Sequence, residues 1–223
     1  MDKIKIFYDG IDIKNDTLIK GYTTNPSILK KYNKPYSELI PPLLDKLIDI
    51  PLSIEVCSDE TVLMLKESKE ISKWGNNIYI KIPIINTKGD YNIEVIQSLI
   101  NDNINVNITC IFTREQIYMI YEKINNNSHK IILSIFSGRI ADTGVSPKIL
   151  CKYTTDLFKD NDNIEVLWAS TREVYNIFDA IDSGCDIITI PESIYQKLYL
   201  INKDLTEYSK ETVQQFISDG KSL

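Results

Sequence analysis

Asn76-Asn77-Ile78-Tyr79-Ile80-Lys81-Ile82-Pro83-Ile84-Ile85 is the stretch from which the fold can be worked out. Its run of isoleucines predicts a buried β-strand, and the single lysine among them needs an explanation. Ammonium groups are almost never fully buried without a partner, and in apolar surroundings they lose their proton more readily than in water. Lys81 is therefore either one half of a buried ion pair or a reactive amine.

The same kind of strand recurs on both sides of this stretch. The eight predicted strands are Ile4–Asp9, Gly21–Asn25, Leu52–Val56, Ile78–Ile84, Ile104–Cys110, Lys130–Phe136, Ile164–Ser170 and Cys185–Ile190. The strands that begin at residues 52, 78, 104 and 130 are 26 residues apart, which is the period of a strand followed by a helix. Helical spacing of apolar residues is found at Ser58–Trp74, Glu94–Ile100, Arg114–Ile124, Pro147–Phe158 and Arg172–Ile181.

Strands that alternate with helices pair in parallel through right-handed crossovers. Eight such units in a chain of 223 residues favour a closed (β/α)8 barrel, the TIM barrel, over an open doubly wound sheet. Gly10–Lys20 has little helical signal, so the count of eight depends on Gly21–Asn25 being a true strand. Asp204–Leu223 predicts an extra C-terminal helix. No linker divides the chain, and we expect one barrel domain over residues 1–223.

Composition excludes several classes of function. The chain has 43% hydrophobic and 25% charged residues with a net charge of −6, which is typical of a globular protein and argues against a nucleic-acid surface. No apolar run approaches the roughly 20 residues that span a membrane, and the first strand starts too early to leave room for a signal peptide. We therefore expect a cytoplasmic protein whose four cysteines are buried small residues in a reducing compartment.

The lone histidine, His129, argues against a Ser-His-Asp or Cys-His mechanism and against a multi-histidine zinc site. Polar residues instead gather at the predicted carboxyl ends of the strands, where barrels of this type carry their chemistry. These residues are Asp9, Thr23, Asn25, Glu55, Lys81, Asn107, Thr109, Arg139, Ser170 and Arg172. Taken singly each has a plain structural interpretation. Asp9 and Ser170 could cap helices, and Glu55 could be the partner of Lys81.

Together these side chains indicate a Schiff-base enzyme. A neutral Lys81 amine can attack a ketone, and the resulting Schiff base accepts electrons from a breaking carbon–carbon bond. Asp9 and Glu55 can move the protons that this chemistry requires. Arg139 and Arg172, with Ser170 beside them, are suited to a phosphate group. The predicted substrate is therefore a phosphorylated sugar.

Five motifs in order resemble the transaldolase family of class I aldolases, in its short single-barrel branch that includes fructose-6-phosphate aldolase. They are Gly21-Tyr22-Thr23-Thr24-Asn25-Pro26-Ser27-Ile28, Tyr79-Ile80-Lys81-Ile82-Pro83, Ile104-Asn105-Val106-Asn107-Ile108-Thr109, Ser134-Ile135-Phe136-Ser137-Gly138-Arg139-Ile140 and Ala169-Ser170-Thr171-Arg172, together with the strand that ends at Asp9. The resemblance implies that Lys81 forms the Schiff base and that Asp9 is the acid/base at carbon–carbon cleavage.

The resemblance assigns the other residues as well. Glu55 and Thr109 would hold a catalytic water, and Thr23, Asn25 and Asn107 would contact the substrate. Arg139, Ser170 and Arg172 would bind its phosphate. Glu55 and Phe136 stand where fructose-6-phosphate aldolases carry glutamine and tyrosine, so both resemble transaldolase. Departures from the family pattern occur at Gly10, Ile135, Ser137, Trp168 and Thr171, and we expect them to change the walls of the pocket.

The leading hypothesis is a transaldolase that moves a dihydroxyacetone unit between sugar phosphates such as fructose 6-phosphate and sedoheptulose 7-phosphate, with the pentose phosphate pathway as the expected setting. A fructose-6-phosphate aldolase-like lyase acting on another sugar phosphate is the alternative. A catalytically silent sugar-phosphate-binding barrel is a third, because fold alone does not decide function. We expect no metal ion, no cofactor, no nucleic acid and no membrane partner. A homo-oligomer is compatible with the sequence.

Overall fold

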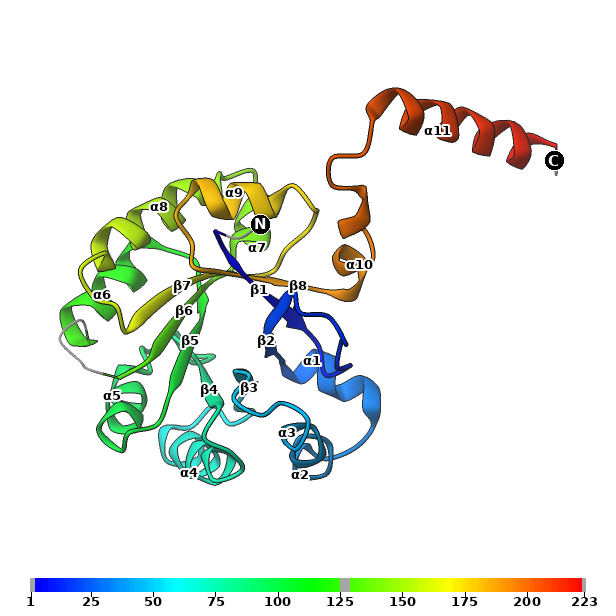
Figure 1. Ribbon diagram of the computed structural model, residues 1–223. Helices are drawn as coiled ribbons and strands as arrows, with labels where there is room; N and C mark the ends of the chain where they lie inside the picture. The colour runs from blue at the N-terminus through cyan, green and yellow to red at the C-terminus, as the bar shows by residue number, and fades with distance from the viewer. Residues whose placement is uncertain (1–2, 125–128, 222–223) are drawn as a thin grey trace.

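Eight parallel strands form a closed barrel in the computed structural model, which describes residues 3–124 and 129–221. They are β1 (Lys5–Asp9), β2 (Ile19–Thr23), β3 (Leu52–Glu55), β4 (Ile78–Pro83), β5 (Val106–Ile111), β6 (Ile131–Ile135), β7 (Ile164–Trp168) and β8 (Ile187–Ile190). Each strand pairs with its neighbours in sequence order, and β8 closes the barrel on β1. The predicted TIM barrel is confirmed, and Figure 1 shows the strands inside a ring of helices.

Helices follow most of the strands. The predicted ones are α4 (Thr61–Ser72), α5 (Ile93–Asn101), α6 (Arg114–Ile124), α8 (Pro147–Phe158) and α9 (Asn176–Asp182). Two of them begin later than predicted because side chains hold the preceding loop. Asn176 Oδ1 accepts the backbone N–H groups of Arg172 and Glu173, and Glu67 accepts those of Cys57 and Ser58. Within the described residues no helix joins β1 to β2, as the weak signal in Gly10–Lys20 indicated.

Several short elements were not predicted from the sequence. They are α1 (Pro26–Leu29), η1 (Lys30–Tyr32), α2 (Tyr36–Leu39), α3 (Pro41–Leu44), α7 (Ser137–Asp142), α10 (Glu192–Tyr195) and η2 (Leu198–Leu200). Most of these lie in the loops that follow strands. None exceeds six residues, so none repeats an apolar period long enough to be recognised in the sequence.

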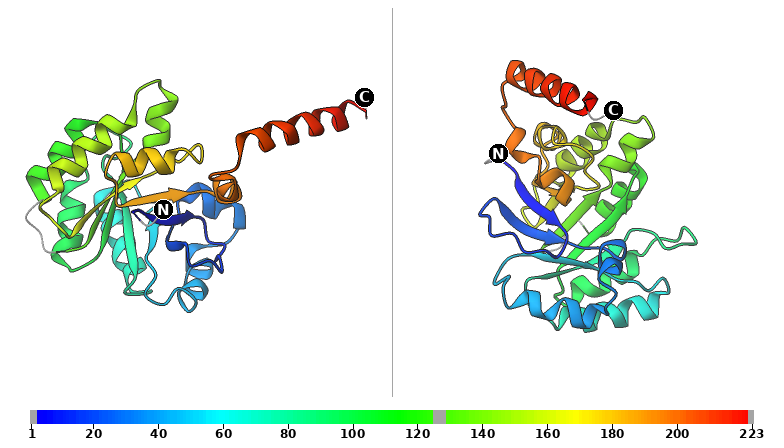
Figure 2. Two further views of the ribbon diagram at one scale, coloured as in Figure 1. Left: turned by 45° about the horizontal axis from the view of Figure 1, so that its top comes forward. Right: turned by 90° about the vertical axis from the view of Figure 1, so that its right-hand side faces the viewer.

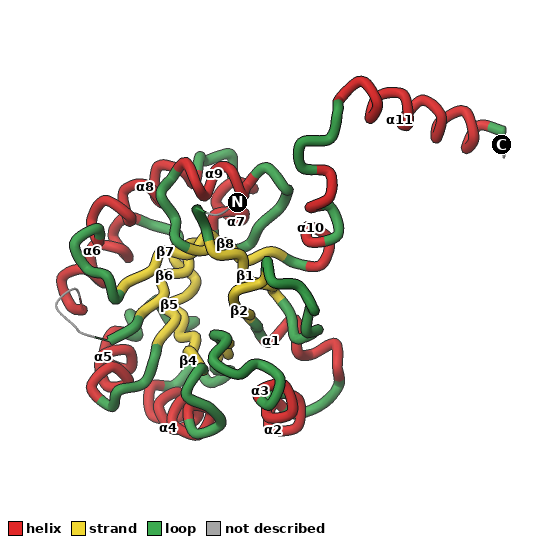
Figure 3. The backbone as a smooth tube through the Cα atoms, viewed as in Figure 1, coloured by secondary structure: helices red, strands yellow, loops and turns green. Residues whose placement is uncertain are grey.

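The alternation of side chains along β4 explains the unusual composition of that strand. Ile78, Ile80 and Ile82 pack in the layer between the barrel and the helices, while Tyr79 packs with Phe7 inside the barrel. Lys81 follows two residues after Tyr79 and therefore points inward as well. The apolar lower layer of the barrel supports a polar upper layer at the strand ends. The yellow strands of Figure 3 surround this interior.

The last helix, α11 (Leu205–Gly220), leaves the barrel and projects from it in every view (Figures 1 and 2). Asp204 caps it by accepting the N–H groups of Thr206 and Glu207. The predicted helix ran to Leu223, but Ser222 and Leu223 lie outside the described residues. No residue in the described part of α11 is buried.

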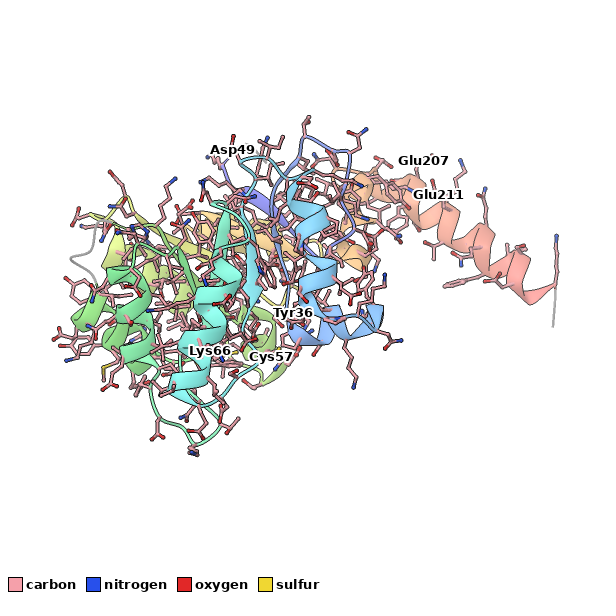
Figure 4. All side chains as sticks on the ribbon, turned by 90° about the horizontal axis from the view of Figure 1, so that it is seen from below. Tyr36, Asp49, Cys57, Lys66, Glu207 and Glu211 are labelled. Atoms are coloured by element: carbon pink, nitrogen blue, oxygen red, sulfur yellow. The ribbon has the colours of Figure 1, made fainter. Side chains whose placement is uncertain are left out.

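The prediction that the cysteines are buried is only half right. Cys151 and Cys185 are buried, whereas Cys110 is partly exposed and Cys57 is exposed. Cys57 lies beyond the end of β3, where its thiol contacts the Tyr36 hydroxyl at 3.3 Å (Figure 4). All four thiols are free. No helix within the described ranges has the length and apolar character needed to cross a membrane.

Candidate active site

A cavity of about 250 Å³ opens at the carboxyl ends of the strands. Nine of the eleven predicted site residues line it: Asp9, Thr23, Asn25, Lys81, Thr109, Phe136, Arg139, Ser170 and Arg172. Glu55 and Asn107 lie just behind its wall. Two larger hollows, of about 490 and 650 Å³, lie at the opposite end of the barrel around Lys5 and Glu165, far from this convergence of polar groups.

Lys81 is 6% exposed and makes two polar contacts. Its ammonium lies 3.1 Å from Glu55 Oε2 and donates a hydrogen bond to the Thr24 carbonyl at 2.8 Å. Glu55 and Lys81 are direct partners in the pairing of β3 with β4, which is why the two side chains meet. The structure thus shows Lys81 as one half of a buried ion pair, and its reactivity as an amine stays a prediction.

Asp9 is the second carboxylate of this cluster. It accepts a hydrogen bond from Thr23 Oγ1 at 2.8 Å, because Asp9 and Thr23 are paired in register on β1 and β2. Burial raises the pKa of Asp9, and the nearby Glu55 carboxylate adds to this effect. The Lys81 charge and the Thr23 hydrogen bond oppose it. Two carboxylates therefore face one ammonium, and Asp9 takes up a proton more readily than an exposed aspartate does.

Thr109 projects from an irregular part of β5. The pairing of β5 with β6 shifts register between Ile108 and Ile111, and Cys110 has a φ of 58°. Such a bulge redirects the side chains beside it, and bulges are common next to active sites. The Thr109 hydroxyl is buried and has no hydrogen-bond partner among the described residues. A buried polar atom of this kind is normally satisfied by an ordered water or a ligand.

Asn107 lies one layer below the cavity. Its Oδ1 accepts a hydrogen bond from Ser134 at 2.7 Å, and its Nδ2 donates to Ser53 Oγ at 3.0 Å. Ser134 itself lines the cavity, so its hydroxyl stands between Asn107 and the open space. These two bonds use one of the two Nδ2 protons and one of the two acceptor sites of Oδ1.

Arg139 and Arg172 lie at the exposed mouth of the cavity. Arg139 lies on α7 with its guanidinium 5.4 Å from the centre of the Phe136 ring, and Arg172 pairs with Asp142 at 2.5 Å. Gly138 lets α7 approach the loop after β7, since a Cβ there would come within 1.6 Å of the Ser170 carbonyl oxygen. Ser170 has a left-handed backbone with a φ of 62°. This contact brings the two arginine-bearing segments together.

The prediction that all five departures change the pocket walls is wrong for four of them. Thr171 does line the cavity. Ile135 and Trp168 point outward into the layer under the helices, and Ser137 contacts the buried Cys151 thiol at 3.3 Å. A Cβ on Gly10 would collide with the Tyr8 ring. The parity of a strand explains the error, because residues next to an inward-facing position point outward.

Sequence reasoning assigned no functional residue to the eighth strand, yet Thr189 of β8 also lines the cavity. Its Oγ1 lies 2.6 Å from Thr23 Oγ1. The signal was present in the sequence, since Thr189 is the one polar residue among the isoleucines of Ile187–Ile190. Other residues that line the cavity and were not predicted are Ser134, Leu167, Ala169 and Pro191.

Comparisons with known proteins concern the sequence and the fold of the whole chain. The family model described as Transaldolase/Fructose-6-phosphate aldolase matches residues 1–223. A probable transaldolase 2 of Listeria monocytogenes is 31% identical over 201 residues, covering 87% of this chain and 86% of its own. A probable transaldolase of a Sulfurihydrogenibium species is 28% identical and covers 99% and 98% of the two chains.

A solved structure of orotidine 5'-monophosphate decarboxylase from Sulfolobus solfataricus is also similar, with a TM-score of 0.57 over 86% of this chain and 90% of its own. At 14% identity this likeness concerns the barrel fold alone. The family match is different in kind, because it spans every strand that contributes a side chain to the cavity. This chain belongs to the transaldolase/fructose-6-phosphate aldolase family.

Proposed function

We propose that the protein is a transaldolase that transfers a dihydroxyacetone unit between sugar phosphates through a Schiff base on Lys81. The observation that carries this proposal is the buried cluster in which one amine faces two carboxylates. A structural ion pair needs only one of these carboxylates. The second, Asp9, has a raised pKa and is suited to accept and return a proton.

The reaction begins with the amine. Lys81 passes its proton to a neighbouring carboxylate and its nitrogen attacks the C2 ketone of the donor sugar, forming a carbinolamine. Loss of water from the carbinolamine leaves an iminium. Glu55 and the unpartnered Thr109 hydroxyl are suited to hold that water, since one can exchange a proton with it and the other can bond to it.

Cleavage follows at the C3–C4 bond. Asp9 takes the proton from the C4 hydroxyl, the bond electrons move into the iminium, and an aldose phosphate leaves while an enamine stays on Lys81. An acceptor aldehyde is then attacked by the enamine, and Asp9 returns its proton to the new hydroxyl oxygen. Hydrolysis releases the new ketose phosphate. The cluster is therefore used in both directions, as a transfer reaction requires.

Arg139, Arg172 and Ser170 bind the phosphate in this proposal, Asn25 and Thr23 lie toward the sugar, and Asn107 acts from behind through Ser134. The guanidinium groups lie at the mouth of the cavity. When the ketone of an open-chain sugar reaches Lys81, the phosphate at the far end of that sugar would remain at this mouth. The proposal needs no cofactor and no metal. The four free thiols are compatible with a cytoplasmic location, which is part of the proposal.

A fructose-6-phosphate aldolase-like lyase is the second candidate, because the matching family contains both activities. Phe136 and Glu55 favour transfer. Phenylalanine has no hydroxyl proton to give to the enamine, and protonation of the enamine is what would release free dihydroxyacetone.

Borohydride trapping tests the central claim. Reduction in the presence of fructose 6-phosphate should add a three-carbon or six-carbon unit to one lysine, identified as Lys81 by peptide mass spectrometry. Lys81→Arg keeps a cation that can pair with Glu55 but is no nucleophile, so it should abolish the adduct and the activity. An adduct at another lysine would refute the mechanism. No adduct at all would favour the silent binding barrel.

The projecting α11 supports a homo-oligomer. Its exposed apolar side chains, at 43–80% exposure, fall on one side of the helix: Leu205, Tyr208, Val213, Phe216 and Ile217. Glu207 and Glu211, labelled in Figure 4, fall on the opposite side. An isolated helix of this length is only marginally stable in water, so we propose that a second copy of the chain covers this face. Sedimentation of the wild type and of Phe216→Ser should show a larger assembly only for the wild type.

A further inference from the structure

Three side-chain oxygens form a continuous hydrogen-bonded chain across β1, β2 and β8. Thr23 Oγ1 lies 2.8 Å from Asp9 Oδ1 and 2.6 Å from Thr189 Oγ1. A hydroxyl has a single proton, and the Thr23 proton is directed to the carboxylate. Thr189 must therefore be the donor in the second bond whenever Asp9 is ionised.

Thr189 is held in place from two sides. Its backbone carbonyl accepts the Thr171 hydroxyl at 2.6 Å, and its strand pairs with β1 at Phe7. Thr189 is 5% exposed and Thr23 is 2% exposed, so water competes little for their hydroxyls. Valine would fill the same space as threonine at this position, and the rest of β8 is isoleucine. Packing alone gives no reason for a hydroxyl here.

We propose that Thr189 is a positioning residue for the acid/base work of Asp9, because its hydroxyl donates to Thr23 and so orients and strengthens the hydrogen bond from Thr23 to the carboxylate. This inference rests on the proposed function for the role of Asp9. It extends that function to the eighth strand, to which sequence reasoning assigned no role.

The two hydroxyls serve both protonation states of Asp9. With the carboxylate ionised, protons point from Thr189 to Thr23 and from Thr23 to Asp9. When Asp9 has taken a proton at Oδ1, each bond can reverse, because every hydroxyl can both donate and accept. No heavy atom has to move. Such a hydrogen-bonded chain reduces the structural rearrangement needed each time Asp9 takes up or releases its proton.

The charged groups that act on Asp9 come from other elements. They are Lys81 of β4, Glu55 of β3 and Lys31 of η1. Thr189 therefore influences Asp9 only through Thr23. Removal of its hydroxyl should weaken the Thr23 bond by the roughly 10–30% that one neighbour contributes in a hydrogen-bonded chain. A carboxylate that receives a weaker bond has a higher pKa.

Steady-state kinetics of Thr189→Val and Thr189→Ser test the proposal. In Thr189→Val, kcat for transfer should fall about 1.3- to 5-fold, the factor expected when one charge-assisted hydrogen bond is weakened by 10–30%, with KM within about twofold of wild type. The acidic limb of the kcat profile should move up by about 0.2–0.7 pH units, because Asp9 must be ionised to accept the C4 hydroxyl proton. Thr189→Ser keeps the hydroxyl and should restore the wild-type profile.

Thr154→Val is the matched control. Thr154 is a buried threonine of α8 whose hydroxyl bonds to the Leu150 carbonyl at 2.8 Å, away from the cavity. It should leave kcat and the pH profile unchanged. If Thr189→Val does not fold, Thr189→Ala replaces it in the comparison with serine.

A wild-type profile in Thr189→Val would overturn the proposal, and so would a serine variant as impaired as the valine variant. Neither result would bear on Lys81 itself. Failure of the proposed function is seen separately, as a wild-type protein that forms no borohydride adduct and transfers no carbon unit.

Discussion

Asp142→Asn is expected to tighten the binding of phosphorylated substrates. Arg172, one of the two proposed phosphate ligands, already pairs with the Asp142 carboxylate at 2.5 Å. A substrate phosphate must therefore take the Arg172 guanidinium from an internal competitor. Asparagine has nearly the same shape but no charge, so it leaves Arg172 in place and weakens only the competing ion pair.

The size of the effect follows from exposure. The Arg172 and Asp142 side chains are 49% and 54% exposed, and ion pairs between such groups contribute about 0–1 kcal/mol. The KM for fructose 6-phosphate should therefore fall by at most about fivefold in Asp142→Asn. Because the pair is exposed, the difference from wild type should shrink as salt rises, where the screening length shortens from about 10 Å at 0.1 M to about 3 Å at 1 M.

The assay compares KM for fructose 6-phosphate and for unphosphorylated fructose at low and high salt. Asp156→Asn is the matched control. Asp156 forms an exposed ion pair with Lys152 on α8, and this substitution changes the net charge by the same amount as Asp142→Asn. The control should not alter either KM. If Asp142→Asn raised KM for fructose 6-phosphate, or changed KM for both substrates by the same factor, Asp142 would not compete with a substrate phosphate for Arg172.

Three further predictions concern other parts of the cavity. Arg139→Ala should raise KM for fructose 6-phosphate by about one to two decades through loss of a charge-assisted contact, while fructose is little affected; equal losses would make Arg139 structural. Phe136→Tyr, alone or with Glu55→Gln, should increase free dihydroxyacetone relative to product formed with erythrose 4-phosphate, because tyrosine supplies a hydroxyl proton. Rapid release by the wild type without an acceptor would favour the aldolase instead. Asp9→Asn should raise the melting temperature at neutral pH. Burial raises the pKa of Asp9 in the folded protein above its value in the unfolded chain, so the folded protein loses stability as the pH rises through the folded pKa and Asp9 ionises. The variant should therefore lose less stability than the wild type between mildly acidic and neutral pH in thermal melts, and a parallel loss would contradict this.

The barrel was predictable because its signal is repeated. Each β-strand is short, but four of them recur at the same interval with an amphipathic helix between, and a closed ring needs all of them to be parallel. The connection between β2 and β3 was not predictable in the same way. It consists of α1, η1, α2 and α3, which are four residues or fewer and owe their conformation to local caps such as Asn25, whose side chain accepts the Ile28 N–H.

The convergence of the candidate site was predictable for a related reason. Strand ends of a parallel barrel meet at one rim, so polar residues at those ends are neighbours wherever they occur in the sequence. The hydrogen-bond partners of these residues cannot be inferred from their position at the strand ends. Whether Asn107 faces the cavity or is tied to Ser53 and Ser134 depends on side-chain orientations within one layer, and the Asp142 partner of Arg172 comes from the end of α7.

The Lys81–Glu55 pair shows how stability and reactivity are balanced in this barrel. In the proposed reaction Lys81 must give up a proton before it attacks a ketone, and at 3.1 Å the Glu55 carboxylate is close enough to receive that proton. An apolar site without Glu55 would free the amine but would leave nothing to receive its proton. Asp9, buried and with a raised pKa, supplies a second acceptor close by, so one proton can be shared among three groups without leaving the cavity. In the proposed mechanism the two carboxylates thus keep the displaced proton within reach of the reaction.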